Sequence, residues 1–171
     1  MQYNRDHNGK LSNLPKQCVD TGMGLERITA VLQKTSDNYK TDIFNNIIES
    51  IAETLNEKNL LNPSLRVIAD HLRSSVFLIS DGVSPSNEGR GYVLRRIIRR
   101  ALTHAYKINN EKDFSFADIF DSLGESLFET YPEVKKNKTV ILQELNSEED
   151  QFRETLKPVS YTHLTLPTIR S

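Results

Sequence analysis

The chain has 171 residues, and its 22 Lys and Arg against 23 Asp and Glu leave a formal net charge of −1. Hydrophobic residues make up 37% and charged residues 26%, a globular composition that excludes a disordered or fibrous protein. The longest strictly apolar run, Val76–Ile79, is far shorter than the roughly 20 residues that cross a bilayer, so no membrane contact is expected. A single cysteine and an N-terminus without an apolar signal region predict a cytoplasmic protein.

The near-neutral total hides a strong partition of charge along the chain. Residues 65–107 carry 8 basic and 3 acidic side chains, whereas residues 108–157 carry 6 basic and 12 acidic ones. A basic middle followed by an acidic stretch indicates a local face that binds a polyanion.

The first elements that we predict are strands. Asn8-Gly9 is a hairpin signal, which predicts that residues 1–5 and 17–21 are neighbouring strands of an antiparallel sheet. Gly22 and Gly24 then break the chain, and a helix begins at Leu25 with apolar residues at helical spacing.

The rest of the chain has the periodicity of helices. The apolar spacing and the capping residues predict five more, which begin near Thr41, Pro63, Arg90, Ser115 (or Asp113) and Pro132. The last two are predicted as unbroken helices, one reaching Leu127 and one carrying Leu145. The fold class is therefore mostly α, with a short β segment at the N-terminus.

The tail, residues 158–171, is rich in Thr and Pro and has no acidic residue, although it follows the acid-rich stretch 144–154. This change of composition predicts a non-native or disordered tail, which we leave out of the fold prediction. A flexible native terminus is the alternative.

A first candidate site lies where the predicted strand meets the helix. Asp20 supplies a carboxylate that could hold an ammonium group, and Gly22 and Gly24 leave room for a flat ligand on the backbone. Arg27 lies in the first helical turn, where its guanidinium could bind a phosphate beside free N–H groups. The alternative is an ordinary strand–turn–helix corner, since a lone GxG pattern is weak.

A second candidate is the helix that begins at Arg90. Arg95, Arg96, Arg99 and Arg100 fall opposite its apolar side, with no acidic residue among them. Like charges at this spacing repel, and planar guanidinium groups suit phosphates, so an anionic partner is one explanation. The other is pairing with the acidic helices of residues 108–157.

The loop before this helix is a third candidate. Asn87 can donate to and accept from base edges, and Gly89 permits close backbone approach. A simple helix cap is the alternative. The four histidines are scattered without metal-ligand spacing, so no metal site is predicted.

Two long motifs resemble one family. VDTGMGLERI at residues 19–28 closely resembles motif 3 of the alanyl-tRNA synthetases, which are class II aminoacyl-tRNA synthetases. SLRVIADHLRSSVFLISDGVSPSNEGRGYVLRRIIRRA, read from Ser64, resembles the helical tRNA-recognition domain that follows it. The resemblance implies that residues 1–36 are the edge of the class II catalytic sheet, that residues 37–157 are part of the recognition bundle, and that residues 158–171 are the tail.

The resemblance also implies roles for the residues of motif 3. Asp20 would bind the α-amino group of L-alanine, and Gly22 would bound a pocket too small for larger side chains. Gly24 would let the adenine of ATP approach the backbone. Arg27 would pair with the γ-phosphate, so that Asp20 and Arg27 are the expected catalytic residues. Mg²⁺ is expected on the phosphates.

The implied RNA partner is the acceptor stem of tRNA-Ala. Asn87 would contact its G·U wobble pair. The stem phosphates would lie on the arginine face, which consists of Arg90, Arg95, Arg96, Arg99 and Arg100.

The resemblance places motifs 1 and 2 before Met1, and the remaining recognition residues and a zinc-binding editing domain after residue 157. The chain alone is therefore expected not to make alanyl-adenylate. A stand-alone helical RNA-binding module without catalysis, or an inert truncation, are the alternatives.

Overall fold

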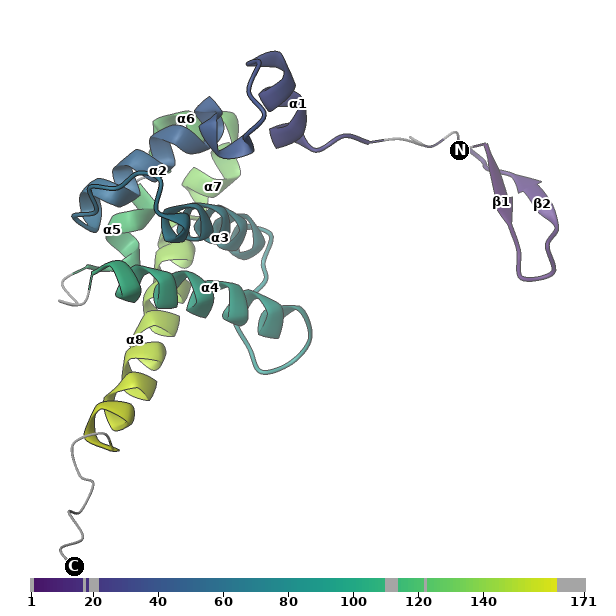
Figure 1. Ribbon diagram of the computed structural model, residues 1–171. Helices are drawn as coiled ribbons and strands as arrows, with labels where there is room; N and C mark the ends of the chain where they lie inside the picture. The colour runs from purple at the N-terminus through teal and green to yellow at the C-terminus, as the bar shows by residue number, and fades with distance from the viewer. Residues whose placement is uncertain (1, 17, 19–21, 110–113, 122, 163–171) are drawn as a thin grey trace, which may run out of the picture. The chain divides into compact units, whose positions relative to one another are not determined.

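The computed structural model describes residues 2–16, 18, 22–109, 114–121 and 123–162, and it forms two compact units, residues 1–41 and 42–171 (Figure 1). Helices dominate, and a small antiparallel sheet lies near the N-terminus, so the predicted fold class is confirmed. Over the described residues, every helix is too short or too polar to cross a membrane.

The first unit begins with a β-hairpin. Strands β1 (Tyr3–Arg5) and β2 (Leu11–Asn13) pair antiparallel, with Arg5 opposite Leu11. In the turn, Asp6 Oδ1 accepts hydrogen bonds from the N–H groups of Asn8 and Lys10, both at 2.9 Å, and Gly9 takes a left-handed φ of +81°. The turn prediction is confirmed, but the second strand directly follows the turn, because a tight turn pairs the segments next to it. Of the strand predicted at 17–21, only residue 18 is described, and it is not in a strand.

Helix α1 (Leu25–Leu32) and the 3₁₀ helix η1 (Asn38–Lys40) complete the first unit. Asp37 caps η1, since its Oδ1 accepts from the N–H of Tyr39 at 3.0 Å. The predicted start of α1 is confirmed. Its apolar residues are mostly exposed, however: Ala30 is buried, whereas Val31 and Leu32 are not.

The second unit is a helical bundle. Its helices are α2 (Asp42–Thr54), α3 (Pro63–Ser80), α4 (Gly89–Ile108), α5 (Phe116–Asp121), α6 (Gly124–Thr130), α7 (Pro132–Lys136) and α8 (Lys138–Thr162). Helices α3 and α4 pack along each other, and α8 contacts both of them (Figure 1). Helix α8 extends through residues 158–162, which the sequence assigned to the tail, while 163–171 lie outside the described residues.

The buried stripe of α3 is the one that the sequence predicts. Asn62 caps this helix by accepting from the N–H of Ser64 at 3.0 Å, and Pro63 occupies the first turn. The fully covered apolar residues of α3 are Leu65, Ile68, Ala69, Leu72 and Val76. Burial of this stripe against α4 and α2 supplies much of the hydrophobic stabilisation of the bundle.

Each of the two predicted C-terminal helices is divided in two. Between α5 and α6, the N–H of Leu123 bonds the carbonyl of Phe120 three residues back, and the poor helix former Gly124 follows. Between α7 and α8, Asn137 Nδ2 donates to the carbonyl of Ser80 at 3.1 Å. That bond ties the break to the end of α3, a long-range contact that local periodicity does not contain.

A buried carboxylate holds α5 against α8. Glu149, 3% exposed, accepts from the N–H of Phe116 at 2.8 Å with Oε2 and from Arg153 Nη2 at 2.6 Å with Oε1. Arg153 also donates to the carbonyl of Phe114 at 2.7 Å. The negative charge of Glu149 lies at the N-terminus of α5, where it stabilises backbone N–H groups that have no partner within the helix.

We predict that Glu149→Gln lowers the free energy of unfolding by about 2 kcal/mol. The change removes the buried negative charge that accepts hydrogen bonds from Arg153 and from the Phe116 N–H. Urea unfolding followed by circular dichroism measures the loss. Asp150→Asn, on the exposed side of the same helix, is the matched control and should shift the free energy by less than about 0.5 kcal/mol. Equal effects of the two changes would contradict the assigned role of Glu149.

Candidate nucleic-acid interface

Helix α4 buries one side and exposes two others. At about 100° per residue, its sequence divides into three sectors. The core sector is apolar and covered, and it contains Leu94, Ile98 and Ala101. Val93, which helical spacing also puts on the apolar side of the sequence, is 54% exposed. The charged residues therefore occupy the two remaining sectors.

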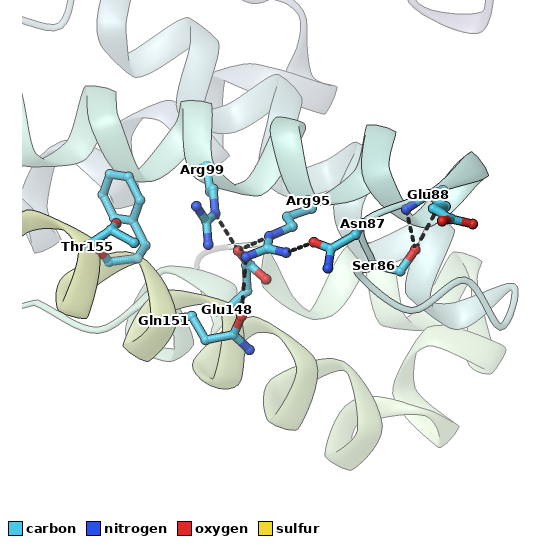
Figure 2. Close-up of polar contacts among 9 residues, drawn as sticks. Ser86, Asn87, Glu88, Arg95, Arg99, Glu148, Gln151 and Thr155 are labelled. Carbon is cyan, nitrogen blue, oxygen red and sulfur yellow. Dashed lines mark hydrogen bonds and ion pairs between the residues drawn. The ribbon is translucent and has the colours of Figure 1, made fainter.

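One of these sectors, which we call the Glu148 face, consists of Arg95 and Arg99. Glu148 of α8 is 3% exposed, and its Oε1 accepts from Arg95 Nε at 3.1 Å and from Arg99 Nε at 2.5 Å (Figure 2). One carboxylate thus separates two like charges that would otherwise repel at i,i+4 spacing. The internal pairing that the sequence left open is confirmed for these two arginines, and their contact with RNA stays a prediction.

Asn87 belongs to the same network. Arg95 Nη1 donates to Asn87 Oδ1, and Arg95 Nη2 donates to Gln151 Oε1 at 3.4 Å (Figure 2). All three nitrogens of the Arg95 guanidinium group therefore donate to acceptors on α8 or on the loop. The side chain of Asn87 remains exposed, and Arg95 fixes which end of its amide faces the helix.

The loop that carries Asn87 is held to the bundle at several points. Ser84 Oγ donates to Glu144 Oε1 of α8 at 2.8 Å, and Ser86 Oγ donates to the carbonyl of Glu88 at 2.9 Å. A Cβ atom on Gly91 would lie 2.4 Å from the Ser84 carbonyl oxygen, so the loop packs directly on the helix backbone there. A Cβ atom on Gly89 would meet open space, and the close approach of a partner to the backbone there stays a prediction.

The third sector, the pocket face, lines a pocket of about 510 Å³ between α3 and α4. Arg96 and Arg100 are exposed beside it, and Arg96 Cζ lies 5.8 Å from the centre of the Tyr92 ring. The residues that line the pocket are His71, Val93, Arg96, Ile97, Arg99, Arg100, Thr103 and His104. Arg90 is exposed in the first turn of α4.

Both histidines of the pocket have partners. His71 Nδ1 lies 2.9 Å from Oδ2 of the neighbouring Asp70, and His104 Nδ1 lies 2.9 Å from Ser64 Oγ. Burial, followed by the positive charges of Lys107 and Arg100, lowers the pKa of His104 below its ordinary value. His104 is therefore poised as a neutral ring that a nearby anion would help to protonate.

The predicted motif 3 residues lie in the first unit. Gly24 precedes α1 in extended conformation, with no side-chain cap, and Arg27 is exposed in the first turn. Gly22 is exposed and has open space around its Cα. Asp20 lies outside the described residues. Within the described residues, no three His, Cys, Asp or Glu side chains gather closely enough to hold a metal ion.

Sequence reasoning missed Glu148 and Gln151 as parts of the interface. A signal was present, because Ile141, Leu145 and Glu148 share one side of α8 at helical spacing, which places a carboxylate on an apolar stripe. An acidic residue in such a position predicts a buried partner of opposite charge.

A profile of the family described as tRNA synthetases class II (A) matches residues 1–160. The chain belongs to this family of class II tRNA synthetases.

Among named proteins, the chain is 52% identical over 156 residues to an alanine–tRNA ligase of Psychromonas ingrahamii, covering 91% of this chain. It is 50% identical over 157 residues to that of Nitrosomonas eutropha and 52% identical over 157 residues to that of Idiomarina loihiensis. The chain spans 18% of the length of these relatives. The predicted resemblance to alanyl-tRNA synthetases is confirmed.

We predict that the lowered pKa of His104 makes the chain less stable in mild acid. The unfolded chain takes up this proton near pH 6.5, whereas the folded chain takes it up only at lower pH, so unfolding becomes easier as the pH falls below about 6.5. Urea unfolding between pH 7.5 and 5.5, of the chain and of His104→Gln, measures the effect.

The free energy of unfolding should fall less with acid in His104→Gln than in the unchanged chain. An NMR titration of the His104 ring gives the independent check, with a midpoint below about 6.5. A midpoint above that value, or parallel pH profiles of the two proteins, would contradict the prediction.

Proposed function

We propose that this protein takes part in the ATP-dependent attachment of alanine to tRNA-Ala in the cytoplasm. The observation that carries the proposal is the exposed amide of Asn87, oriented by Arg95, in a chain about half identical to alanine–tRNA ligases. In this proposal, the second unit binds the acceptor stem, and the first unit contributes to the site where alanine is activated.

The geometry around Asn87 supports a role in reading a base pair. Its Oδ1 already accepts from Arg95, so the Nδ2 group offers donors to base acceptors, and one lone pair of Oδ1 remains for a donor such as a guanine amino group. Both kinds of group lie in the minor groove of a G·U pair. Since Glu148 and Gln151 hold Arg95, the amide meets the RNA in one orientation.

The arginines on the two outer sectors of α4 would position the stem. Arg90, Arg96 and Arg100 are exposed, and guanidinium groups bind phosphates in a fixed geometry. Arg95 and Arg99 would add positive potential, because Glu148 neutralises one of their two charges. Phosphate contacts of this kind fix the register of the RNA, whereas Asn87 would supply the sequence preference.

The donors of the first unit fit a nucleotide phosphate. The uncapped first turn of α1 offers backbone N–H groups, and Arg27 is exposed beside them. We assign Arg27 to the γ-phosphate of ATP, Gly24 to the adenine, Gly22 to the wall of the alanine pocket and Asp20 to the ammonium group of alanine. Mg²⁺, when bound, would neutralise phosphate charge.

The chemistry of these assignments is one of positioning. The alanine carboxylate attacks the α-phosphorus of ATP, and pyrophosphate leaves to give alanyl-adenylate. A ribose hydroxyl of the tRNA then attacks the alanyl carbonyl carbon, which forms the ester and releases AMP. Asp20 would orient the amino acid, and Arg27 would stabilise charge on the departing pyrophosphate. The alternative, an RNA-binding module without catalysis, would bind RNA through the second unit in the same way. Its first unit would not bind ATP or alanine.

The experiment that tests RNA reading compares two acceptor-stem hairpins, one with a G·U pair and one with G·C in its place. We predict that the chain binds the G·U hairpin about 5- to 100-fold more tightly, the effect of one well-made base contact, and that Asn87→Ala brings this ratio to about one. Fluorescence anisotropy at fixed salt measures both affinities.

Asn146→Ala, an exposed position on α8, is the matched control and should keep the ratio of the unchanged chain. A preference for G·U that survives in Asn87→Ala would show that another residue reads the pair. An unchanged chain that binds both hairpins equally would contradict the proposed function.

A further inference from the structure

The pocket between α3 and α4 shares Arg99 with the Glu148 face, and its other lining residues belong neither to that face nor to the loop that carries Asn87. Its lining includes Arg96, Arg100 and two histidines, and none of the described residues that line it is acidic. Asp70 is the acidic neighbour, and it pairs with His71 Nδ1. A pocket with this charge attracts an anion.

The two pocket-side arginines differ from those on the Glu148 face. Arg95 and Arg99 each place Nε on Glu148, while Arg96 contacts the ring of Tyr92 and Arg100 lies beside His104. Glu148 thus pairs with Arg95 and Arg99, whereas Arg96, Arg100 and Thr103 line the pocket. The positive charge of the pocket face stays available to an external partner.

The pocket also has an apolar part. Val93 and Ile97 line it next to the guanidinium groups, and Val93 is 54% exposed. A nucleotide unit matches this arrangement, because its phosphate suits arginine forks and the carbon face of its ribose can pack on aliphatic side chains. Thr103 Oγ1 donates to the Arg99 carbonyl, so its oxygen can still accept a hydrogen bond.

We propose that the pocket lined by His71, Arg96, Arg100 and His104 binds a ribose-phosphate unit of the RNA backbone, with the phosphate on the two arginines and the ribose on Val93 and Ile97. This inference rests on the proposed function and adds a backbone site away from the base-reading Asn87. Arrival of the phosphate places a negative charge near His104, whose protonated ring then becomes an additional donor.

The test uses the two acceptor-stem hairpins with Arg100→Gln, and with Lys136→Gln as the control that removes the same charge from an exposed position on α7. Arg100 is exposed, so Arg100→Gln should fold normally, which circular dichroism checks. We expect Arg100→Gln to weaken binding of both hairpins about three- to tenfold and to reduce the salt slope by about one, with the G·U preference kept.

A second measurement locates the RNA directly. In NMR spectra of the unchanged chain, the ring signals of His71 and His104 should shift when the G·U hairpin is added, and the shift of His104 should be smaller in Arg100→Gln. Both histidine signals staying in place would overturn the proposal.

The outcomes separate the pocket from the proposed function. If Arg100→Gln matches Lys136→Gln in affinity and salt slope while the G·U preference persists, the pocket assignment is wrong and the proposed function stands. If the unchanged chain binds both hairpins through the pocket without preferring G·U, the pocket assignment is supported and the base-reading role of Asn87 is wrong. Absence of binding to either hairpin overturns both.

Discussion

The arrangement of the candidate interface depends on one buried carboxylate. Glu148 accepts from the Nε atoms of Arg95 and Arg99, and this shared contact joins α4 to α8 (Figure 2). A buried ion pair adds little stability compared with an apolar pair of the same shape, but loss of one partner is costly. Its effect here is geometric, because a fixed Arg95 also fixes the amide of Asn87.

The same contact explains how four arginines fit on one helix. Arg95 and Arg99 turn toward α8, whereas Arg96 and Arg100 lie beside the pocket of α3. Two of the arginine charges thereby belong to an internal network, and two lie on an outward surface. The sequence allowed pairing with acidic helices or binding of an anionic partner, and the first explanation applies to Arg95 and Arg99. An RNA that reaches both Asn87 and the pocket would cross α4 on its exposed sides.

The sequence predicted elements whose signals are local. Helix α3 has Pro63 in its first turn and an unbroken apolar stripe, and both its start and its buried residues are confirmed. The break before α8 was missed, because it depends on a bond from Asn137 to Ser80, far away in the chain. The pairing of the arginines with Glu148 could not be predicted for the same reason, because the charge composition of residues 108–157 does not indicate which acidic side chain the packing buries.

We expect Glu148 to couple energetically to Arg99 and not to Arg100. A double-mutant cycle with Glu148→Gln and Arg99→Gln, followed by urea unfolding, measures this coupling. The predicted coupling energy is about 1–3 kcal/mol, while the parallel cycle with Arg100→Gln should be additive within about 0.5 kcal/mol. Additive behaviour of the Arg99 cycle, or equal coupling in both cycles, would contradict the division of the arginines.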